Sequence, residues 1–217
     1  MQEHALADSP ELAEIIRHSA KPTDINDHLP ALFTEALAVK PELIVELGVR
    51  SGESTFVLER VAGLCGARLV SVDVCDCSSV STYKRWTFVR KDDVEFAHEF
   101  PAWCGSRGIR PRIDVLFIDT SHLYDHTVRE IAAYFPFLSP AAKVFFHDTN
   151  LRYVNFRRNG SFCFGGWNNK RGVIRAIEDF LGTPLNEKRD FVAMHKGWVI
   201  KHVACCNGFT ILQKHIA

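Results

Sequence analysis

The sequence predicts an α/β fold in which a mostly parallel sheet carries helices on both faces. Five short segments after residue 42 are apolar almost throughout, and segments with helical spacing separate them. Strands that are buried on both faces have this composition, because helices cover both sides of a parallel sheet. Near the C-terminus, Asn207–Gly208 separates two further strand-like segments, which predicts a hairpin. We therefore expect a mostly parallel, seven-stranded sheet that ends in a C-terminal antiparallel hairpin.

The composition is that of a folded domain and excludes several classes of protein. Of the 217 residues, 47% are hydrophobic, and 26 Lys and Arg balance 26 Asp and Glu to a formal net charge of zero. This excludes a disordered chain and argues against binding nucleic acid by bulk attraction to phosphate. The N-terminus lacks the features of a signal peptide, and no apolar run approaches the ~20 residues that span a bilayer. The seven cysteines, an odd number, fit reduced thiols, so we expect a cytoplasmic protein with no membrane partner.

Two helices are expected before the first strand. The first covers residues 9–20 and begins with a capping serine followed by a proline. The second runs from Asp27 to about Ala38, where apolar residues recur at helical spacing. We interpret residues 1–40 as an N-terminal helical cap and residues 41–217 as the main domain. The sequence leaves open whether the cap forms a wall of a ligand pocket or a contact in a homo-oligomer.

The alternating part of the chain begins after the cap. The expected parallel strands cover residues 43–49, 67–74, 86–92, 113–119 and 142–148. The expected helices cover residues 54–64, a segment after Asp92, 125–138 and 172–181. Residues 198–205 and 209–215 would form the hairpin.

Carboxylates stand in or directly after each of the five expected parallel strands. They are Glu46, Asp73, Asp92, Asp119 and Asp148. Ligands of open parallel sheets bind beyond the carboxyl ends of the strands, so we expect these side chains to meet at one edge. Because clustered carboxylates repel one another, they imply a bound cation or a cationic ligand.

The loop after the first strand, Gly48–Gly52, lets the backbone approach a ligand closely. It lacks the GxGxxG spacing of dinucleotide sites and the GK[ST] of a P-loop. The acidic surroundings suit S-adenosylmethionine, which carries a sulfonium, an amino group and a ribose diol.

The segments VELGVRSGEST, SVDV and FIDTSHLYDHTVREIAAYFPFLSPAAKVFFHDT resemble the class I S-adenosylmethionine-dependent methyltransferases. The similarity covers roughly residues 40–215. Within that class they resemble the metal-dependent small-molecule O-methyltransferases of the macrocin and mycinamicin type, and cephalosporin hydroxylase-like proteins are similar in the same region. The resemblance implies a Rossmann-like fold and methyl transfer to a hydroxyl of a small molecule of the sugar or phenolic natural-product type.

The resemblance also implies how the cofactor would be bound. The expected contacts are Glu46, Gly48, Ser51, Gly52, Ser54, Asp73, Asp92 and Asp119. Glu46 would bind the amino end of the cofactor or order the glycine loop. Asp73 would bind the ribose hydroxyls, and Asp92 would lie near the adenine.

By the same resemblance, Asp119 and Asp148 match metal-binding carboxylates, and His122 matches a general base. The family often has a second acid where this chain has His147. Imidazole is a poor ligand for Mg²⁺ but binds Mn²⁺ or Fe²⁺. We expect Mg²⁺ or a similar divalent ion on Asp119 and Asp148, with His147 as a candidate ligand. Asp119 and His122 are the expected catalytic pair, although His122 could instead cap the next helix.

Residues 151–171 are rich in aromatic and basic residues and contain no acid, which predicts a lid over the site. We expect contacts to a polar or anionic acceptor from Tyr153, Arg157 and Trp167.

Two other functions remain open at this stage. One is a hydroxylase whose iron is bound by His122, His147 and either Asp119 or Asp148. The other is a cofactor-binding accessory protein that has lost its chemistry.

Overall fold

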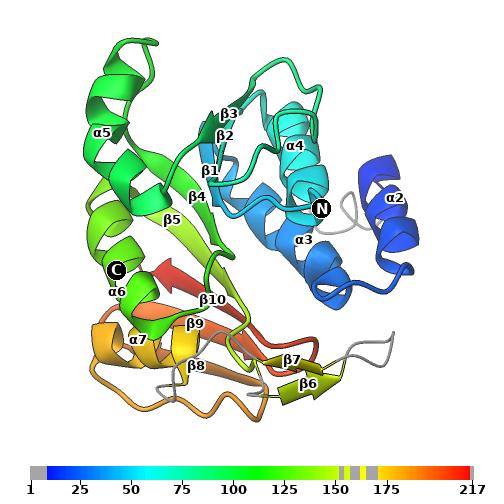
Figure 1. The fold of residues 1–217 in the computed structure, drawn as a ribbon, viewed down its shortest axis with the longest axis vertical. Coiled ribbons are helices and arrows are strands. Elements are labelled where there is room, and N and C mark those ends of the chain that lie inside the picture. The colour runs from blue at the N-terminus through cyan, green and yellow to red at the C-terminus, as the bar shows by residue number, and fades with distance from the viewer. Residues whose placement is uncertain (1–8, 152–153, 157–161, 165–170, 216–217) are drawn as a thin grey trace.

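A computed structural model describes residues 9–151, 154–156, 162–164 and 171–215, and its main feature is an eight-stranded sheet (Figure 1). Five strands are parallel in the order β3 (Trp86–Arg90), β2 (Arg68–Asp73), β1 (Leu43–Leu47), β4 (Ile113–Ile118) and β5 (Leu138–His147). Three antiparallel strands follow: β10 (Phe209–Lys214), β9 (Trp198–Val203) and β8 (Phe191–His195). The expected α/β fold with its C-terminal antiparallel hairpin is confirmed.

The sheet has one strand more than the seven expected, because β8 pairs with β9. The turn between them consists of Lys196 and Gly197, both of which have positive φ angles. Two consecutive residues of this conformation match the right-handed twist of a hairpin. The dipeptide Lys-Gly is a weaker sequence signal for a turn than Asn-Gly, so the sequence alone does not predict β8.

Helices cover both faces of the sheet (Figure 1). On one face lie α3 (Leu29–Val39) and α4 (Glu53–Cys65), with α2 (Pro10–Ser19) packed outside them. On the other lie α5 (Asp93–Gly105), α6 (Tyr124–Tyr134) and α7 (Gly172–Leu181). Because side chains alternate along a strand, Ile44 of β1 packs beneath α3 and α4 while Val45 packs on the other face. Both faces of the parallel strands are therefore buried, as their apolar sequences predicted.

Short helical turns flank two of these helices. A 3₁₀ turn, η1 (Asn26–His28), leads into α3, and another, η2 (Phe135–Phe137), follows α6. The expected helix over residues 125–138 was therefore too long at its C-terminal end. Pro136 lacks the N–H that would continue the helix, and its ring restricts the residue before it.

Little of the expected lid falls within the described residues. The structure describes two paired three-residue strands there, β6 (Val154–Phe156) and β7 (Phe162–Phe164). No helix in the described part of the chain is long and apolar enough to cross a membrane.

Candidate active site

Two adjoining hollows lie at the carboxyl ends of the parallel strands. The larger has a volume of about 410 Å³, and its lining includes Asp73, Asp92 and Asp119. The smaller has a volume of about 20 Å³, and its lining includes Ser51 and Ser54. Gly48, Arg50 and Asp119 line both. The expected edge of the sheet therefore does form a ligand-sized cavity.

Close steric contacts, together with the backbone conformation, require glycine at two positions of the loop. A Cβ atom on Gly48 would lie 2.0 Å from the carbonyl oxygen of Asp119, and one on Gly52 would lie 2.2 Å from Val80. Both glycines also have positive φ angles, 86° and 85°. Only glycine fits here, and the bare backbone of Gly48 is what remains to face a ligand.

Glu46 ties the first turn of α4, which follows the glycine loop, to β2. Its carboxylate is fully buried and accepts hydrogen bonds from the hydroxyls of Ser54 (2.7 Å), Thr55 (2.9 and 3.0 Å) and Ser71 (2.5 Å). Burial raises the pKa of Glu46 to about 7, against the opposing effect of these hydroxyls. The two roles expected for Glu46, binding the amino end of the cofactor and ordering the loop, both stay predictions.

Asp73 and Asp92 lie where the sequence placed them, at the ends of β2 and β3. Asp73 Oδ2 accepts a hydrogen bond from the Val49 N–H at 2.8 Å, which ties β2 to the glycine loop. Asp92 caps α5 by accepting from the Glu95 N–H at 3.0 Å. Because a carboxylate can accept several hydrogen bonds, both retain capacity toward the cavity.

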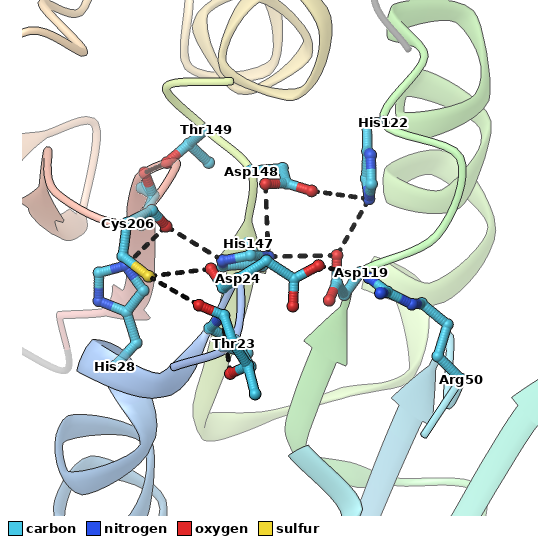
Figure 2. A network of polar contacts seen from close by, with 12 residues as sticks. Thr23, Asp24, His28, Arg50, Asp119, His122, His147, Asp148, Thr149 and Cys206 are labelled. Carbon is cyan, nitrogen blue, oxygen red and sulfur yellow. Dashed lines mark hydrogen bonds and ion pairs between the residues drawn. The ribbon is translucent and has the colours of Figure 1, made fainter. Parts of the chain in front are cut away.

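Asp119, His122 and Asp148 form one cluster (Figure 2). His122 Nε2 lies 3.1 Å from Asp119 Oδ1 and 2.9 Å from Asp148 Oδ2. Both His122 (φ 59°) and Asp148 (φ 56°) adopt the left-handed backbone region, which non-glycine residues rarely occupy. Such backbone strain is typical of functional sites, and here it occurs at the two residues whose side chains meet at 2.9 Å.

His147 lies behind this cluster and is fully buried. Its Nδ1 is 3.3 Å from Asp119 Oδ1, and its Nε2 is 3.3 Å from the carbonyl oxygen of Cys206 (Figure 2). The carbonyl can only accept, so Nε2 carries a proton and donates it. His147 therefore contacts one candidate metal-binding carboxylate directly while its other nitrogen is held by the backbone.

The charges of this cluster stabilise one another. Burial opposes ionisation of the imidazoles, but Asp119 and Asp148 raise the pKa of His122 to about 10 and that of His147 to about 9. Burial alone would raise the pKa of Asp119, but the neighbouring His147 and His122 hold it well below its usual range. Both imidazoles are thus protonated at neutral pH when only the protein's own groups are present.

The donor set fits a divalent metal ion. One ligand atom from each of Asp119, His122 and Asp148 lies within 4.8 Å of the others, and Asp148 Oδ1 is buried without a hydrogen-bond partner. Asp119 and Asp148 offer carboxylate oxygens, which Mg²⁺ and Mn²⁺ both accept, and His122 Nε2 lies against both carboxylates.

The structure also brings in residues that sequence reasoning missed. Asp24 and Arg50 line the smaller hollow, and His126, 2.9 Å from Asp93, lines the larger one. Asp24 lies in the N-terminal segment, and no local pattern relates it to the glycine loop. The three predicted acceptor contacts, Tyr153, Arg157 and Trp167, lie outside the described residues.

Comparison with known proteins agrees with this geometry. Residues 45–149, which include the glycine loop and the acidic cluster, match the family model described as a methyltransferase domain. The matched stretch is a little under half of the chain, and it is similar to a methyltransferase domain. No curated protein sequence matches the chain.

Solved structures share the fold of this chain at low sequence identity. MycE methyltransferase of the mycinamycin biosynthetic pathway, in complex with Mg, SAH and mycinamycin VI, is 17% identical with a TM-score of 0.60, covering 96% of this chain and 55% of that chain. The O-methyltransferase from Bacillus cereus in complex with SAH is 15% identical with a TM-score of 0.56, covering 95% and 91%. CalS11, a calicheamicin methyltransferase, is 17% identical with a TM-score of 0.51, covering 95% and 93%. The chain described here thus spans about half the length of MycE.

Proposed function

We propose that this protein transfers a methyl group from S-adenosylmethionine to a hydroxyl of a small molecule, with a divalent metal ion held by Asp119 and Asp148. The observation that carries the proposal is the Asp119, His122 and Asp148 cluster beside a cavity of about 410 Å³. Two of the similar structures contain SAH, and MycE also contains Mg. The match to a methyltransferase domain favours this reaction over the hydroxylase alternative.

The cofactor would lie across both hollows. The cavity that contains Asp73 and Asp92 is large enough for its adenosine part, since ligand pockets begin at about 300 Å³. Asp73 would accept hydrogen bonds from the ribose hydroxyls, and Asp92 would face the adenine. The reactive sulfonium would then lie near Gly48 and Asp119, which line both hollows.

His122 is the proposed general base for the acceptor hydroxyl. A divalent ion on the two carboxylates supplies two effects when bound: it lowers the pKa of the hydroxyl and offsets the carboxylate charge. With the carboxylate charge offset in this way, His122 would no longer be held in its protonated form, and its neutral imidazole would accept the proton of the hydroxyl. His147 and the Cys206 carbonyl would keep Asp119 in place during the reaction.

The acceptor is proposed to be a small polar molecule of the sugar or phenolic type, with no nucleic-acid partner. Adjacent hydroxyls on such a molecule can approach a metal ion together, which fixes the attacking oxygen relative to the methyl group. The cytoplasmic location and the formation of a homo-oligomer stay predictions from the sequence.

Calorimetry with S-adenosylmethionine, Mg²⁺, Mn²⁺ and anaerobic Fe²⁺ tests the proposal. We expect the cofactor to bind, and Asp148→Asn to weaken Mn²⁺ binding about tenfold or more while the cofactor affinity stays within about twofold. Glu42→Gln is the control, since Glu42 is exposed and lies at the start of β1, at the opposite edge of the sheet. Absence of cofactor binding would exclude methyl transfer, and equal Mn²⁺ binding by both variants would exclude the metal site.

A further inference from the structure

An ion pair between two distant segments forms part of the lining of the smaller hollow. Arg50 lies in the loop after β1, and Asp24 precedes η1. Arg50 Nη1 is 2.5 Å from Asp24 Oδ2, and both residues line the hollow of about 20 Å³. Figure 2 shows the Arg50 side chain reaching toward Asp24 beside Asp119.

This hollow is too small for the part of the cofactor that would enter it. A volume of about 20 Å³ holds about one water molecule. The methionine tail of S-adenosylmethionine carries an ammonium, a carboxylate and several carbons. If adenosine occupies the larger cavity, the tail would enter between Asp24 and Arg50, and the two side chains would separate to admit it.

The charges of the lining match the two ends of that tail. Among the described residues that line the hollow, Arg50 is the one cation, and it would bind a carboxylate. Three acids line it, of which Glu53 pairs with His18 at 2.8 Å and Asp119 contacts two imidazoles. Asp24 is the acid whose partner here is Arg50, and separation of that pair makes it available to an ammonium.

The backbone around Asp24 is anchored, whereas its side chain takes part in an exposed ion pair with Arg50. Cys206 Sγ donates to the Asp24 carbonyl at 3.0 Å, and the next residue, Ile25, is buried. The side chains of Arg50 and Asp24 are 69% and 39% exposed. An exposed ion pair contributes little stability, so the pair can open by rotamer changes alone while the segment stays in place.

We infer that Asp24 and Arg50 are the positioning residues for the amino-acid end of the cofactor, Asp24 binding its ammonium and Arg50 its carboxylate. Before the cofactor binds, Asp24 and Arg50 form an ion pair with each other at the position that its amino-acid end would take. The inference rests on the proposed use of S-adenosylmethionine. Asp24 lies outside residues 45–149, so the N-terminal segment completes a site that the methyltransferase domain leaves open.

Calorimetry with two ligands tests this inference. S-adenosylhomocysteine contains the amino-acid tail, whereas 5′-methylthioadenosine has the same nucleoside and lacks the tail. We expect Asp24→Asn and Arg50→Gln each to weaken S-adenosylhomocysteine binding about tenfold, and to change 5′-methylthioadenosine binding less than about twofold. Arg60→Gln is the matched control, because Arg60 pairs with Glu14 of α2 (2.8 Å) and lines neither hollow.

The ratio of the two affinities separates a direct role from a structural one. Equal weakening of both ligands, or an unchanged affinity for S-adenosylhomocysteine, overturns the inference and leaves the proposed function intact. A wild-type protein that binds neither ligand overturns the proposed function, and the inference with it.

Discussion

Replacing Glu46 by glutamine is expected to change how the stability of the protein depends on pH. Glu46 lies beneath the glycine loop with no exposed surface, and three hydroxyl groups donate to it. Glutamine has the same shape and no charge. The hydroxyls can also accept hydrogen bonds, so they can accommodate the new amide group.

The magnitude follows from the pKa of the buried carboxyl. Burial raises this pKa from 4.5 to about 7. A raised pKa means that the folded state binds the proton more tightly than the unfolded chain. This tighter proton binding contributes about 3 kcal/mol to the free energy of unfolding. The contribution is fully present below pH 4.5 and is lost as the pH rises through 7. From about pH 5 to about pH 8, the free energy of unfolding of Glu46→Gln minus that of the wild type should therefore rise by about 2 to 3 kcal/mol.

Urea unfolding followed by circular dichroism at several pH values between about 5 and 8 measures this difference. The variant's free energy of unfolding minus that of the wild type should rise with pH. Glu42→Gln, at an exposed carboxylate, should give a difference that does not vary with pH. A constant difference for Glu46→Gln, or one that falls with pH, would refute the reasoning that Glu46 is protonated by burial.

Two further predictions concern the site itself. Gly48→Ala should destabilise the protein by about 2 kcal/mol or more and weaken S-adenosylhomocysteine binding, because its Cβ would lie 2.0 Å from the Asp119 carbonyl oxygen at a positive φ. Gly63 lies in α4, and a Cβ atom added there would meet no neighbouring atom within 4 Å, so Gly63→Ala should instead stabilise the protein by about 0.5 kcal/mol. Thermal unfolding of both variants checks the contrast. His122→Ala should lower the methyl-transfer rate by about 10² to 10⁴ while cofactor affinity stays within about twofold, and a retained rate would exclude His122 as the base.

The gathering of acids at one edge of the sheet was predictable, because it follows from short segments of sequence. Apolar runs specify strands that are buried on both faces, and parallel strands bring their carboxyl ends together. Asp73, Asp92 and Asp119 therefore line one cavity, as the order of strands and acids implied. The hairpin around Asn207–Gly208 was also predictable, because that dipeptide favours a tight turn between β9 and β10.

The contacts within the site could not be predicted in the same way. His122 was expected three residues after Asp119, but its approach to Asp148 depends on left-handed backbone at both 122 and 148. Neither residue type requires that conformation, so no sequence pattern signals it. The place of His147, between Asp119 and the Cys206 carbonyl, depends on how the C-terminal hairpin packs beside β5.

By itself, the sequence determined the parallel strands, their helices and the edge at which the acids gather, because hydrophobic periodicity and turn chemistry act between near neighbours in the chain. Only the tertiary structure decided which of these side chains touch, and that Asp24 reaches Arg50 across 26 positions of sequence. Such contacts depend on the packing of whole elements against one another. Their geometry is set by the combined burial of many apolar residues, and no short segment contains that information.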